Sequence, residues 1–441
     1  MSKKDFNKDA QKNSGIQKGL SDDALLDIVQ QRTLGYFTDF AHPACGMARE
    51  RSNVVSGYGY DLDCVTTGGT GFGIMALIAG TERGWISRED TLAQITKIVD
   101  FLETADKHHG AFSHFLDGNT GKTIPFSPKD DGGDLVETSF LMAGLLSARQ
   151  YFAGQPDAAG LCAKINALWE GVEWDWYTQN NSGKLYWHWS PNHGWDMNLP
   201  VEGWNECLIT HVLAQASPTH AVPEDVYKNS WTQGKDFKNG QSYDGITLPL
   251  GPAQGGPLFL SHYSFMGLDP QKLGDDHTDY FTQNRNHALI NRAHCIKNPH
   301  GYKGYGEECW GLTASDDHNG YAAHAPDNDT GVISPTAALS SMPYTPQESM
   351  QALRHFYEDK GDRLFGKYGF IDGFNETENW YADSHLAIDQ GPIVVMIENH
   401  RSGLLWDLFM SCPEIGPALD RLDFKKEPPA NSKPASPAPR L

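Results

Sequence analysis

Hydrophobic and polar positions along this chain follow two kinds of helical pattern. In the first kind, apolar residues recur every three to four positions and polar residues fill the opposite face, as in surface helices. The clearest case, SDDALLDIVQQRTLGYFTDF, opens with a Ser/Asp cap, which is typical of a helix N-terminus. These amphipathic segments are residues 21–40, 88–105, 269–296 and 346–365.

The second kind of segment is apolar on nearly every face and rich in Gly, Ala and Ser. A helix that is hydrophobic all round is buried all round. Six such segments start about 64 residues apart on average, with the amphipathic helices between them. This alternation predicts an all-α (α/α)6 toroid with six inner helices, six outer helices and short β-hairpins in the loops; the alternative is an irregular helical bundle. The buried segments are residues 66–80, 134–150, 201–216, 255–267, 334–342 and 388–403.

The two ends of the chain differ from the rest in composition. Residues 1–20 are polar, and residues 425–441 form a Pro-, Ser- and Lys-rich tail that cannot bury a core, so both are predicted to be disordered. Residues 21–424 contain no linker of that composition and are predicted to form one domain. The N-terminal residues lack the apolar segment of a secretion signal, and the compartment stays open.

Composition narrows the possible partners. The net charge of −21 argues against nucleic acid or an anionic membrane surface, because either needs a basic patch, and it favours a neutral or cationic substrate. No apolar run approaches the length of a membrane-spanning helix. The 12 Trp and 17 Tyr gather in loop-like stretches such as YWHWSPNHGWDMNLPVEGW, which is typical of sugar stacking or of loop anchoring. The seven cysteines include no C-x-x-C pair, so scattered thiols are expected.

The stretch DDGGDLVETSF, at the start of the second buried segment, holds the densest group of carboxylates. Asp134 and Glu137 have the spacing of a capping box, in which each side chain satisfies a free amide of the first helical turn. Capping leaves Asp130 and Asp131 unexplained. Neighbouring carboxylates repel one another and raise their pKa values, which makes an acid or a base available near neutral pH.

Two further carboxylates stand at the starts of buried segments. Glu206 lies near Trp204 and Trp195, where burial would raise its pKa as a proton donor requires; the alternative is a simple partner for the helix dipole. Asp389 begins the sixth segment and Asp383 precedes it, in a place that also suits a capped helix entry. Inverting hydrolysis of a glycosidic bond needs an acid and a carboxylate about 6.5–9.5 Å apart, with water between them.

Three other motifs give weaker evidence for a functional site. The APDNDTG sequence at 325–331 resembles the start of a calcium loop, but Ala338 stands where an EF-hand needs Glu. The GGTGFG sequence at 68–73 lacks the strand of a dinucleotide fold and is predicted to allow close helix packing. The histidines at 108–109 and 114 lack the spacing of metal ligands, and we expect them to lie at the surface or in hydrogen bonds. No metal or cofactor is therefore predicted.

Long ordered blocks across residues 22–424 resemble the bacterial glucoamylase-like domain, a group that includes β-1,2-glucanases. The blocks include ERSN (50–53), VTTGGTGFG (65–73), GYGEECWGLTASDD (304–317), HAPDNDTGVISPTAALSSMPYTP (324–346) and AIDQGPIVVMIENHRSGLLW (387–406). LVETSFLMAGLL, VEGWNE, GGPLFLSHYSF and NRNHALINRAHC extend the match. The resemblance implies an (α/α)6 toroid that hydrolyses β-1,2-glucan with inversion and needs no metal.

The same resemblance implies roles for particular residues. Asp130, Asp134, Glu137 and Glu206 match the acidic block and the Trp-Asn-Glu position, where the important carboxylates are expected, with Glu206 as the acid. Asp389 is the candidate for activating water, and Asp383 is the alternative. The expected sugar contacts are Arg51, Thr67, Trp195, His262, Tyr263, Trp310, Trp380 and Asp383.

The sequence thus predicts a monomeric glycoside hydrolase whose partner is a neutral glucan oligo- or polysaccharide. Two alternatives stay open. A polysaccharide lyase on the same toroid would use Tyr, His or Arg on an acidic polymer, and a non-catalytic glycan-binding protein would bind without cleaving. Loops at the mouth of the toroid decide between endo and exo action, and the sequence does not.

Overall fold

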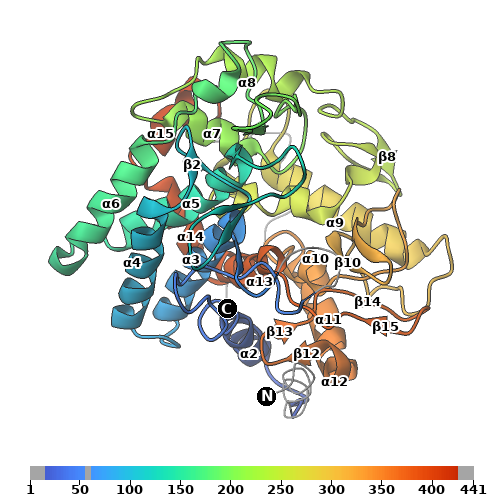
Figure 1. Cartoon of the computed structure of the whole chain (residues 1–441). Helices are drawn as coiled ribbons and strands as arrows, with labels where there is room; N and C mark the ends of the chain where they lie inside the picture. Colours follow the sequence, from blue (N-terminus) through green and yellow to red (C-terminus); the bar gives the residue numbers. More distant parts are fainter. Residues whose placement is uncertain (1–14, 55–60, 426–441) are drawn as a thin grey trace.

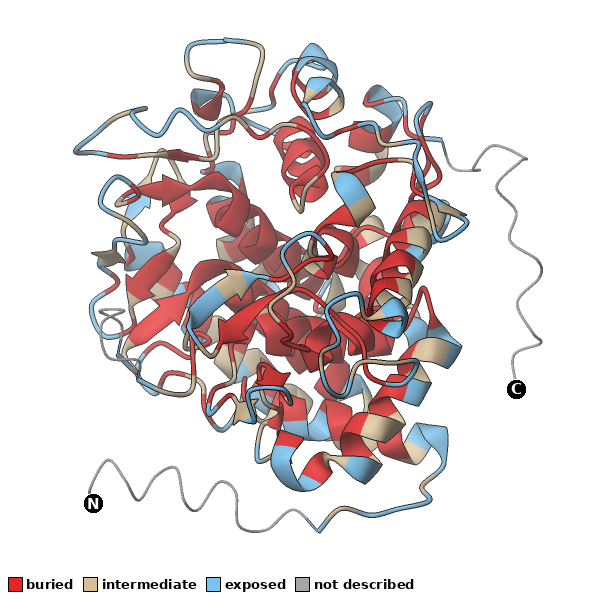
Figure 2. Cartoon of the chain, turned by 90° about the vertical axis from the view of Figure 1, so that its right-hand side faces the viewer, coloured by how far each residue is buried: buried red, intermediate tan, exposed pale blue. Residues whose placement is uncertain are grey.

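The structure, a computed structural model, describes residues 15–54 and 61–425 and has two concentric layers of helices (Figure 1). The inner layer is apolar and lies at the centre, whereas the outer helices expose one face (Figure 2). This is the (α/α)6 toroid that the alternating pattern predicts. The inner elements are α3 (Thr67–Glu82), α5 (Leu135–Tyr151), α7 (Leu208–Ala216), the 3₁₀ turns η5 (Leu258–Ser261) and η6 (Ser264–Met266), α10 (Pro335–Leu339) and α13 (Ala387–Arg401).

Shorter helices complete the outer layer. α14 packs against α5 and α13, and α15 packs against α7. The outer helices are α2 (Asp22–Leu34), α4 (Arg88–Thr104), α6 (Ala159–Glu170), α8 (Asp225–Asn229), α9 (Tyr280–Lys297), α11 (Pro346–Arg354), α12 (Gly361–Leu364), α14 (Leu404–Met410) and α15 (Ile415–Arg421). No helix of the described residues is long and apolar enough to cross a membrane.

Close approach of α3 and α5 explains the glycine-rich start of the first inner helix. A Cβ atom on Gly71 would lie 2.1 Å from the carbonyl oxygen of Phe140, and one on Gly144 would lie 2.2 Å from the carbonyl oxygen of Gly71. Only residues without a side chain allow this backbone contact. The prediction that the GGTGFG sequence serves helix packing is therefore confirmed.

All strands are short, and they pair in antiparallel fashion in the loops between helices. The one three-stranded sheet of the described residues has the order β1 (Cys64–Thr66), β4 (Phe115–Asp117), β5 (Thr123–Ile124). β6 (Gly133–Asp134) pairs with β7 (His188–Trp189), although residues 135–187 separate the two strands in the sequence. The remaining pairs are β2 (Lys107–His108) with β3 (Ala111–Phe112), β8 (Ser242–Tyr243) with β9 (Ile246–Thr247), β10 (Ala314–Asp317) with β11 (Gly320–Ala323), β12 (Phe365–Gly366) with β13 (Gly369–Phe370), and β14 (Phe374–Asn375) with β15 (Trp380–Tyr381).

Two inner segments differ from the continuous helices that their apolar patterns predict. The segment at 255–267 forms only 3₁₀ turns, after two glycines with φ of 97° and 75° at Gly255 and Gly256. α7 begins at Leu208 rather than near 201, because the chain turns at Gly203 with φ of 78°. Positive φ values interrupt a helix. As a result, Glu206 stands in the turn before α7 and not within its first turns.

The ends of the described chain are attached to the domain. The backbone amide of Gln17 donates to the hydroxyl of Tyr357 at 3.4 Å, and Ile16 packs against the cluster that holds Tyr357. Residues 15–20 thus depart from the predicted disorder of the first 20 residues, and residues 1–14 and 426–441 lie outside the described residues. All seven cysteines are free thiols, and six of them are buried, as the sequence predicts.

Candidate active site

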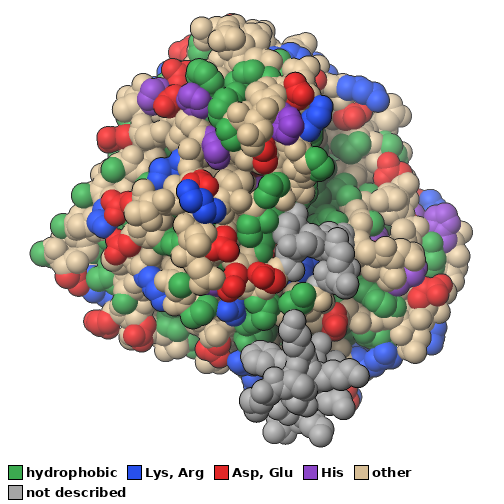
Figure 3. Space-filling view, viewed as in Figure 1, with side chains coloured by type: hydrophobic (Ala, Val, Ile, Leu, Met, Phe, Trp, Pro, Cys, Tyr) green, Lys and Arg blue, Asp and Glu red, His purple; other side chains and the backbone are tan. Residues whose placement is uncertain are grey.

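A cavity of about 540 Å³ opens where the inner helices begin. On the face of the molecule drawn in Figure 3, the surface is hollowed near the middle and hydrophobic side chains show at the floor of the hollow. The starts of α3, α5 and α13 and the turn before α7 supply the walls. The lining residues are Glu50, Arg51, Thr66, His114, Phe115, Phe126, Val136, Glu137, Phe140, Trp187, Glu206, Phe259, Tyr263, Ala314, Tyr321, Leu386 and Ile388.

Asp134 caps α5 and holds a histidine at the same time. Its Oδ1 accepts hydrogen bonds from the amides of Val136 and Glu137 at 3.0 and 2.9 Å. Its Oδ2 lies 3.0 Å from Nδ1 of His114. The cap predicted from the sequence is thus half correct, because the Glu137 carboxylate turns away from the N-cap amide and accepts from the amide of Gly68 on α3 at 2.8 Å.

The carboxylates before and at the start of α5 share one cation. Burial alone would lower the pKa of His114, but the neighbouring Glu137 and Asp134 outweigh it and raise that pKa to about 9. Nε2 of His114 lies 3.9 Å from Oε1 of Glu137. Burial raises the pKa of Glu137 to about 7, and the His114 cation opposes that rise. Burial and the charge of Asp134 raise the pKa of Asp130 to about 6.

Glu206 reaches the cavity from the turn before α7. Its side chain is half-buried and lines the cavity together with Glu137. Burial raises the pKa of Glu206 to about 7, and the charges of Glu137 and Asp134 add to the rise. The Ser264 hydroxyl on η6 donates to the carbonyl of Glu206 and accepts from the amide of Ile209 at 3.0 Å, which fixes this turn. Glu206 is therefore a neutral acid for part of its population at neutral pH.

A second group of carboxylates lies across the mouth, before α13. Arg51 donates to Glu50 Oε2 at 2.8 Å and to both oxygens of Asp316 at 3.2 Å. The backbone amide of Asp316 donates to Oδ2 of Asp372 at 2.6 Å, and the Asp372 carboxyl is in turn hydrogen-bonded to that of Asp389. Arg51 and Glu50 line the cavity, whereas Asp372 and Asp389 lie behind them and are 2% exposed.

Asp372 and Asp389 share a proton. Oδ1 of Asp372 and Oδ2 of Asp389 are buried and have no donor within reach among the described residues. Two ionised carboxylates would leave both atoms unsatisfied, and one shared proton supplies the missing hydrogen bond. Burial, together with the charge of Asp372, raises the pKa of Asp389 well above its usual value. Asp389 is thus shifted toward its neutral form and lies outside the lining of the cavity.

Of the sugar contacts expected from the sequence, the structure brings Arg51 and Tyr263 to the cavity. Thr67 is fully buried and its hydroxyl donates to the carbonyl of Ser113 at 2.5 Å, while its neighbour Thr66 lines the cavity. His262 is 2% exposed and its Nε2 lies 3.0 Å from the hydroxyl of Ser341.

The expected tryptophan contacts lie elsewhere. Trp310 is fully buried in a hydrophobic core cluster. Trp195 lines a separate surface pocket, and Trp380 is half-buried on β15 with its ring 6.4 Å from that of His318. Asp383 is exposed and accepts from the side-chain amide of Asn53 at 2.6 Å. The structure therefore does not bring these four residues into the cavity.

Several residues of the site carried little signal in the sequence. His114 precedes β4, and its carbonyl accepts from the amide of Thr67 at 3.1 Å, so tertiary pairing places it beside α5. Glu50 belongs to the ERSN block, but the sequence did not indicate that its carboxylate accepts a hydrogen bond from Arg51 beside it. Trp187 reaches the cavity from the same aromatic-rich stretch that holds Trp195, the tryptophan that the sequence predicts as a sugar contact. A strand pairing prediction for residues 64–66 with 115–117 is the signal that would have located His114.

One group of possible metal ligands occurs among the described residues. Ligand atoms of His114, Asp130 and Asp134 lie within 4.8 Å of one another. Two of these residues already satisfy one another, since His114 Nδ1 and Asp134 Oδ2 form a hydrogen bond. A histidine with a raised pKa is protonated and cannot ligate a metal through that nitrogen. The arrangement suits an ion pair better than a metal centre.

Comparison with known proteins gives the family. A family model described as "Putative glucoamylase" matches residues 198–413. The endo-β-1,2-glucanase of Chitinophaga pinensis, solved with sophorotriose and glucose, is 57% identical; its structure has a TM-score of 0.90, and the match covers 92% of this chain and 99% of that one. This chain belongs to the glucoamylase-like family. A structure from Bacteroides uniformis with the same glucoamylase description is 54% identical, with a TM-score of 0.90 over 93% of this chain and 99% of that one.

A curated relative is longer than this chain. The exo-β-1,2-glucooligosaccharide sophorohydrolase of Parabacteroides distasonis is 46% identical over an alignment of 440 positions that covers 95% of this chain. The chain spans 60% of the length of that relative. Membership of this family agrees with the toroid and with the resemblance that the sequence blocks indicate.

Proposed function

We propose that this protein is a glycoside hydrolase that cleaves β-1,2-glucan with inversion, with Glu206 as the acid and Glu137 as the base. One observation carries the assignment: both carboxyls line one cavity with pKa values of about 7, but only Glu137 has the His114 cation beside it. When two neighbouring carboxyls share roughly one proton, a cation favours the ionised form of the group it adjoins. Glu206 therefore keeps the proton.

The proposed reaction follows from these protonation states. Glu206 donates its proton to the glycosidic oxygen as the bond to the anomeric carbon breaks, and Glu137 removes a proton from the water that attacks that carbon from the opposite face. The product has the inverted anomeric configuration, and the acid and base have exchanged protonation states. Asp134 is a positioning residue in this scheme, because its oxygens are used by the α5 cap and by His114.

Asp130 and Asp389 take supporting roles in the proposal. Asp130 has a buried Oδ1 without a donor among the described residues, which leaves it able to accept a hydrogen bond from a water. Asp389, expected from the sequence as the base, has a raised pKa and is proposed to be protonated, so it would not accept the proton of water. Its carboxyl is hydrogen-bonded to that of Asp372, behind Arg51. This moves the base from the start of α13 to the start of α5.

The lining of the cavity suits a neutral sugar chain. Trp187, Phe259, Tyr263 and Tyr321 offer flat apolar faces for the C–H faces of pyranose rings. Arg51 and Glu50 offer hydrogen-bond donors and acceptors at the same wall. The relatives that act on β-1,2-glucan or its oligosaccharides give the linkage. We propose that the enzyme acts as a monomer.

The test is hydrolysis of linear β-1,2-glucan by wild type and Glu206→Gln, with products resolved by length and anomer. We expect α-configured reducing ends from wild type and a loss of about 100- to 10,000-fold in kcat for the variant. Full activity in Glu206→Gln would remove the acid assignment, and cleavage of another glucan but not of this one would remove the substrate. An unsaturated product would indicate a lyase, and tight binding without products would indicate a glycan-binding protein.

A further inference from the structure

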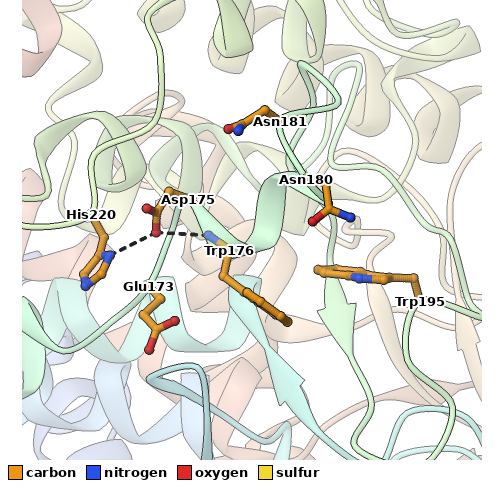
Figure 4. A pocket seen from close by; sticks show the side chains of 7 residues that line it. All are labelled: Glu173, Asp175, Trp176, Asn180, Asn181, Trp195 and His220. Atoms are coloured by element: carbon orange, nitrogen blue, oxygen red, sulfur yellow. Dashed lines mark hydrogen bonds and ion pairs between the residues drawn. The ribbon is translucent and has the colours of Figure 1, made fainter.

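A second pocket, of about 310 Å³, lies outside the cavity. Most of its lining comes from the loop that follows α6, at residues 173–181, and Trp195 and His220 complete it (Figure 4). Its size falls at the lower end of the range for small-molecule sites, which suits one or two sugar rings rather than a long ligand. The catalytic mechanism uses none of its residues.

Two tryptophans form the floor of this pocket. Trp176 is 37% exposed, and its ring centroid lies 6.4 Å from that of Trp195 with 32° between the planes. His109 stacks on Trp176 at 3.6 Å between centroids and 14° between planes, so one face of the indole is covered and the ring is held in place. The two rings are too close for a sugar to enter between them, and they serve instead as adjoining platforms.

The polar groups around the platforms match sugar hydroxyls. Asn180 and Asn181 are exposed, and both line the pocket together with Trp195 (Figure 4). An amide side chain offers both a donor and acceptors, as a vicinal diol requires. The Glu173 carboxylate lies 2.9 Å from Nδ1 of His109, and the Asp175 carboxylate lies 3.0 Å from Nδ1 of His220.

The side chains of the pocket favour uncharged ligands over acidic ones. None of its seven described lining residues is Lys or Arg, so no side chain there pairs with a phosphate, sulfate or carboxylate in the way Arg does. Each of its two carboxylates is matched with a histidine and presents acceptor oxygens. Flat aromatic surface with neutral amides and acceptors is the chemistry that recognises an uncharged carbohydrate.

The strand pair β6–β7 connects the pocket to the catalytic cavity. A Cβ atom on Gly133 would lie 2.1 Å from the hydroxyl of Tyr177, so the pocket loop packs directly on β6, whose second residue, Asp134, caps α5. Gly133 pairs with Trp189 on β7, and the Trp189 ring makes an edge contact with Trp176 at 6.1 Å. The same stretch of chain carries Trp187 into the cavity.

We infer that the Trp176–Trp195 pocket is a second binding site for neutral glucan, separate from the cleavage site, which holds a remote part of a long chain while another part is cut. The identity of the glucan rests on the proposed function; the pocket's preference for uncharged sugar rests on its own lining. A long substrate engages both sites and gains affinity by their linkage, whereas a short oligosaccharide engages only the cavity.

The test compares Trp176→Ala with Ile296→Ala, an exposed hydrophobic side chain that lines neither pocket. In a Glu206→Gln background, electrophoresis through gels containing long β-1,2-glucan measures binding without cleavage. We expect Trp176→Ala to weaken retardation about 3- to 10-fold, the range that the loss of one aromatic contact gives, and Ile296→Ala to match its parent. In the active enzyme, Trp176→Ala should raise KM for long glucan to the same extent and leave kcat/KM for the shortest cleaved oligosaccharide unchanged.

The outcomes separate this inference from the proposed function. If wild type cleaves β-1,2-glucan but Trp176→Ala binds and cleaves long chains as wild type does, the second site is absent and the hydrolase assignment stands. If no β-1,2-glucan is cleaved or retarded, gels with other neutral glucans measure the pocket alone, and equal mobility of both variants in every gel overturns the inference. A matching loss on the shortest oligosaccharide would also overturn it, since Trp176 would then act through the cavity. Asn180→Ala, at an exposed position that preserves the core, repeats the test if Trp176→Ala fails to fold.

Discussion

Two acidic clusters face each other across the mouth of the toroid, and they differ in access and counter-charge rather than in the number of carboxylates. The cluster at α5 lies beside His114, a cation that lines the cavity with Glu137. The cluster at α13 is satisfied by Arg51 in front and by a shared proton behind, between Asp372 and Asp389. The first is arranged to exchange protons with the cavity, whereas the second presents the Arg51–Glu50 ion pair to the cavity and keeps Asp372 and Asp389 buried behind it.

This difference shows what a raised carboxyl pKa signifies. Burial raises the pKa of Glu137 and of Asp389 alike, yet only Glu137 has an oxygen directed at the cavity and a cation that draws its proton away. A perturbed pKa identifies an acid or base only where the group can reach substrate. Substituting one residue from each cluster tests this difference between them.

Glu137→Gln and Asp389→Asn give the largest contrast. We expect Glu137→Gln to lower kcat on β-1,2-glucan about 100- to 10,000-fold, because the amide cannot accept the proton of the attacking water. We expect Asp389→Asn to lose less than about tenfold, or 1.4 kcal/mol, because an amide keeps the shape and neutrality of the protonated carboxyl. Steady-state rates by reducing-end assay, with circular dichroism to verify folding, make the comparison.

The reverse ranking would return the base to α13. If Asp389→Asn is inactive while Glu137→Gln turns over, the shared proton between Asp372 and Asp389 is not the resting state and the α13 cluster supplies the base. Added azide sharpens the result, because azide can replace the attacking water without a base. If azide restores activity to Glu137→Gln but not to Asp389→Asn, and the product is the α-glycosyl azide, the missing base is Glu137.

His114→Gln gives an intermediate effect and separates counter-charge from geometry. The His114 cation lowers the pKa of Glu137, so its removal raises that pKa, and the base must be ionised to act. The acidic limb of the pH profile of kcat/KM should therefore move to higher pH, by about 1–3 units for a neighbouring charge of opposite sign. Gln still donates to Asp134, so a rate loss at all pH values without a shift of the limb would mean that His114 only positions α5.

The sequence predicted the toroid because the inner helices are apolar on all faces, and such a composition indicates burial. Segments apolar on all faces became α3, α5, α10 and α13 near the predicted bounds. The fourth inner segment failed because an apolar pattern does not distinguish a helix from 3₁₀ turns when glycines with positive φ precede it. Local composition thus located the layers but not the conformation of every inner element.

The site was predictable where a side chain stands at the start of a buried helix, as Glu137 and Glu206 do. His114 was not predictable, because antiparallel pairing of β1 with β4 brings it beside α5 and no local pattern encodes that pairing. The predicted tryptophan contacts were wrong for another reason, since a large aromatic ring is as suitable for a hydrophobic core as for stacking on a sugar. Trp310 is fully buried, whereas Trp187 reaches the cavity.

The smallest expected effect concerns stability, and it tests the closed cluster without any substrate. The folded protein raises the pKa of Asp389, and that of Asp372 to about 8, above the usual value near 4, so the folded state binds an extra proton between about pH 4 and pH 8. Stability from this pair is present below that window and is lost as pH rises through it. Asp389→Asn cannot lose that proton, so its melting temperature should fall less between pH 5 and pH 8, by about 1–2 °C for each kcal/mol retained. Asp383→Asn, an exposed Asp next to the same helix, should follow the wild-type slope, and parallel slopes for all three proteins would show that Asp372 and Asp389 share no proton.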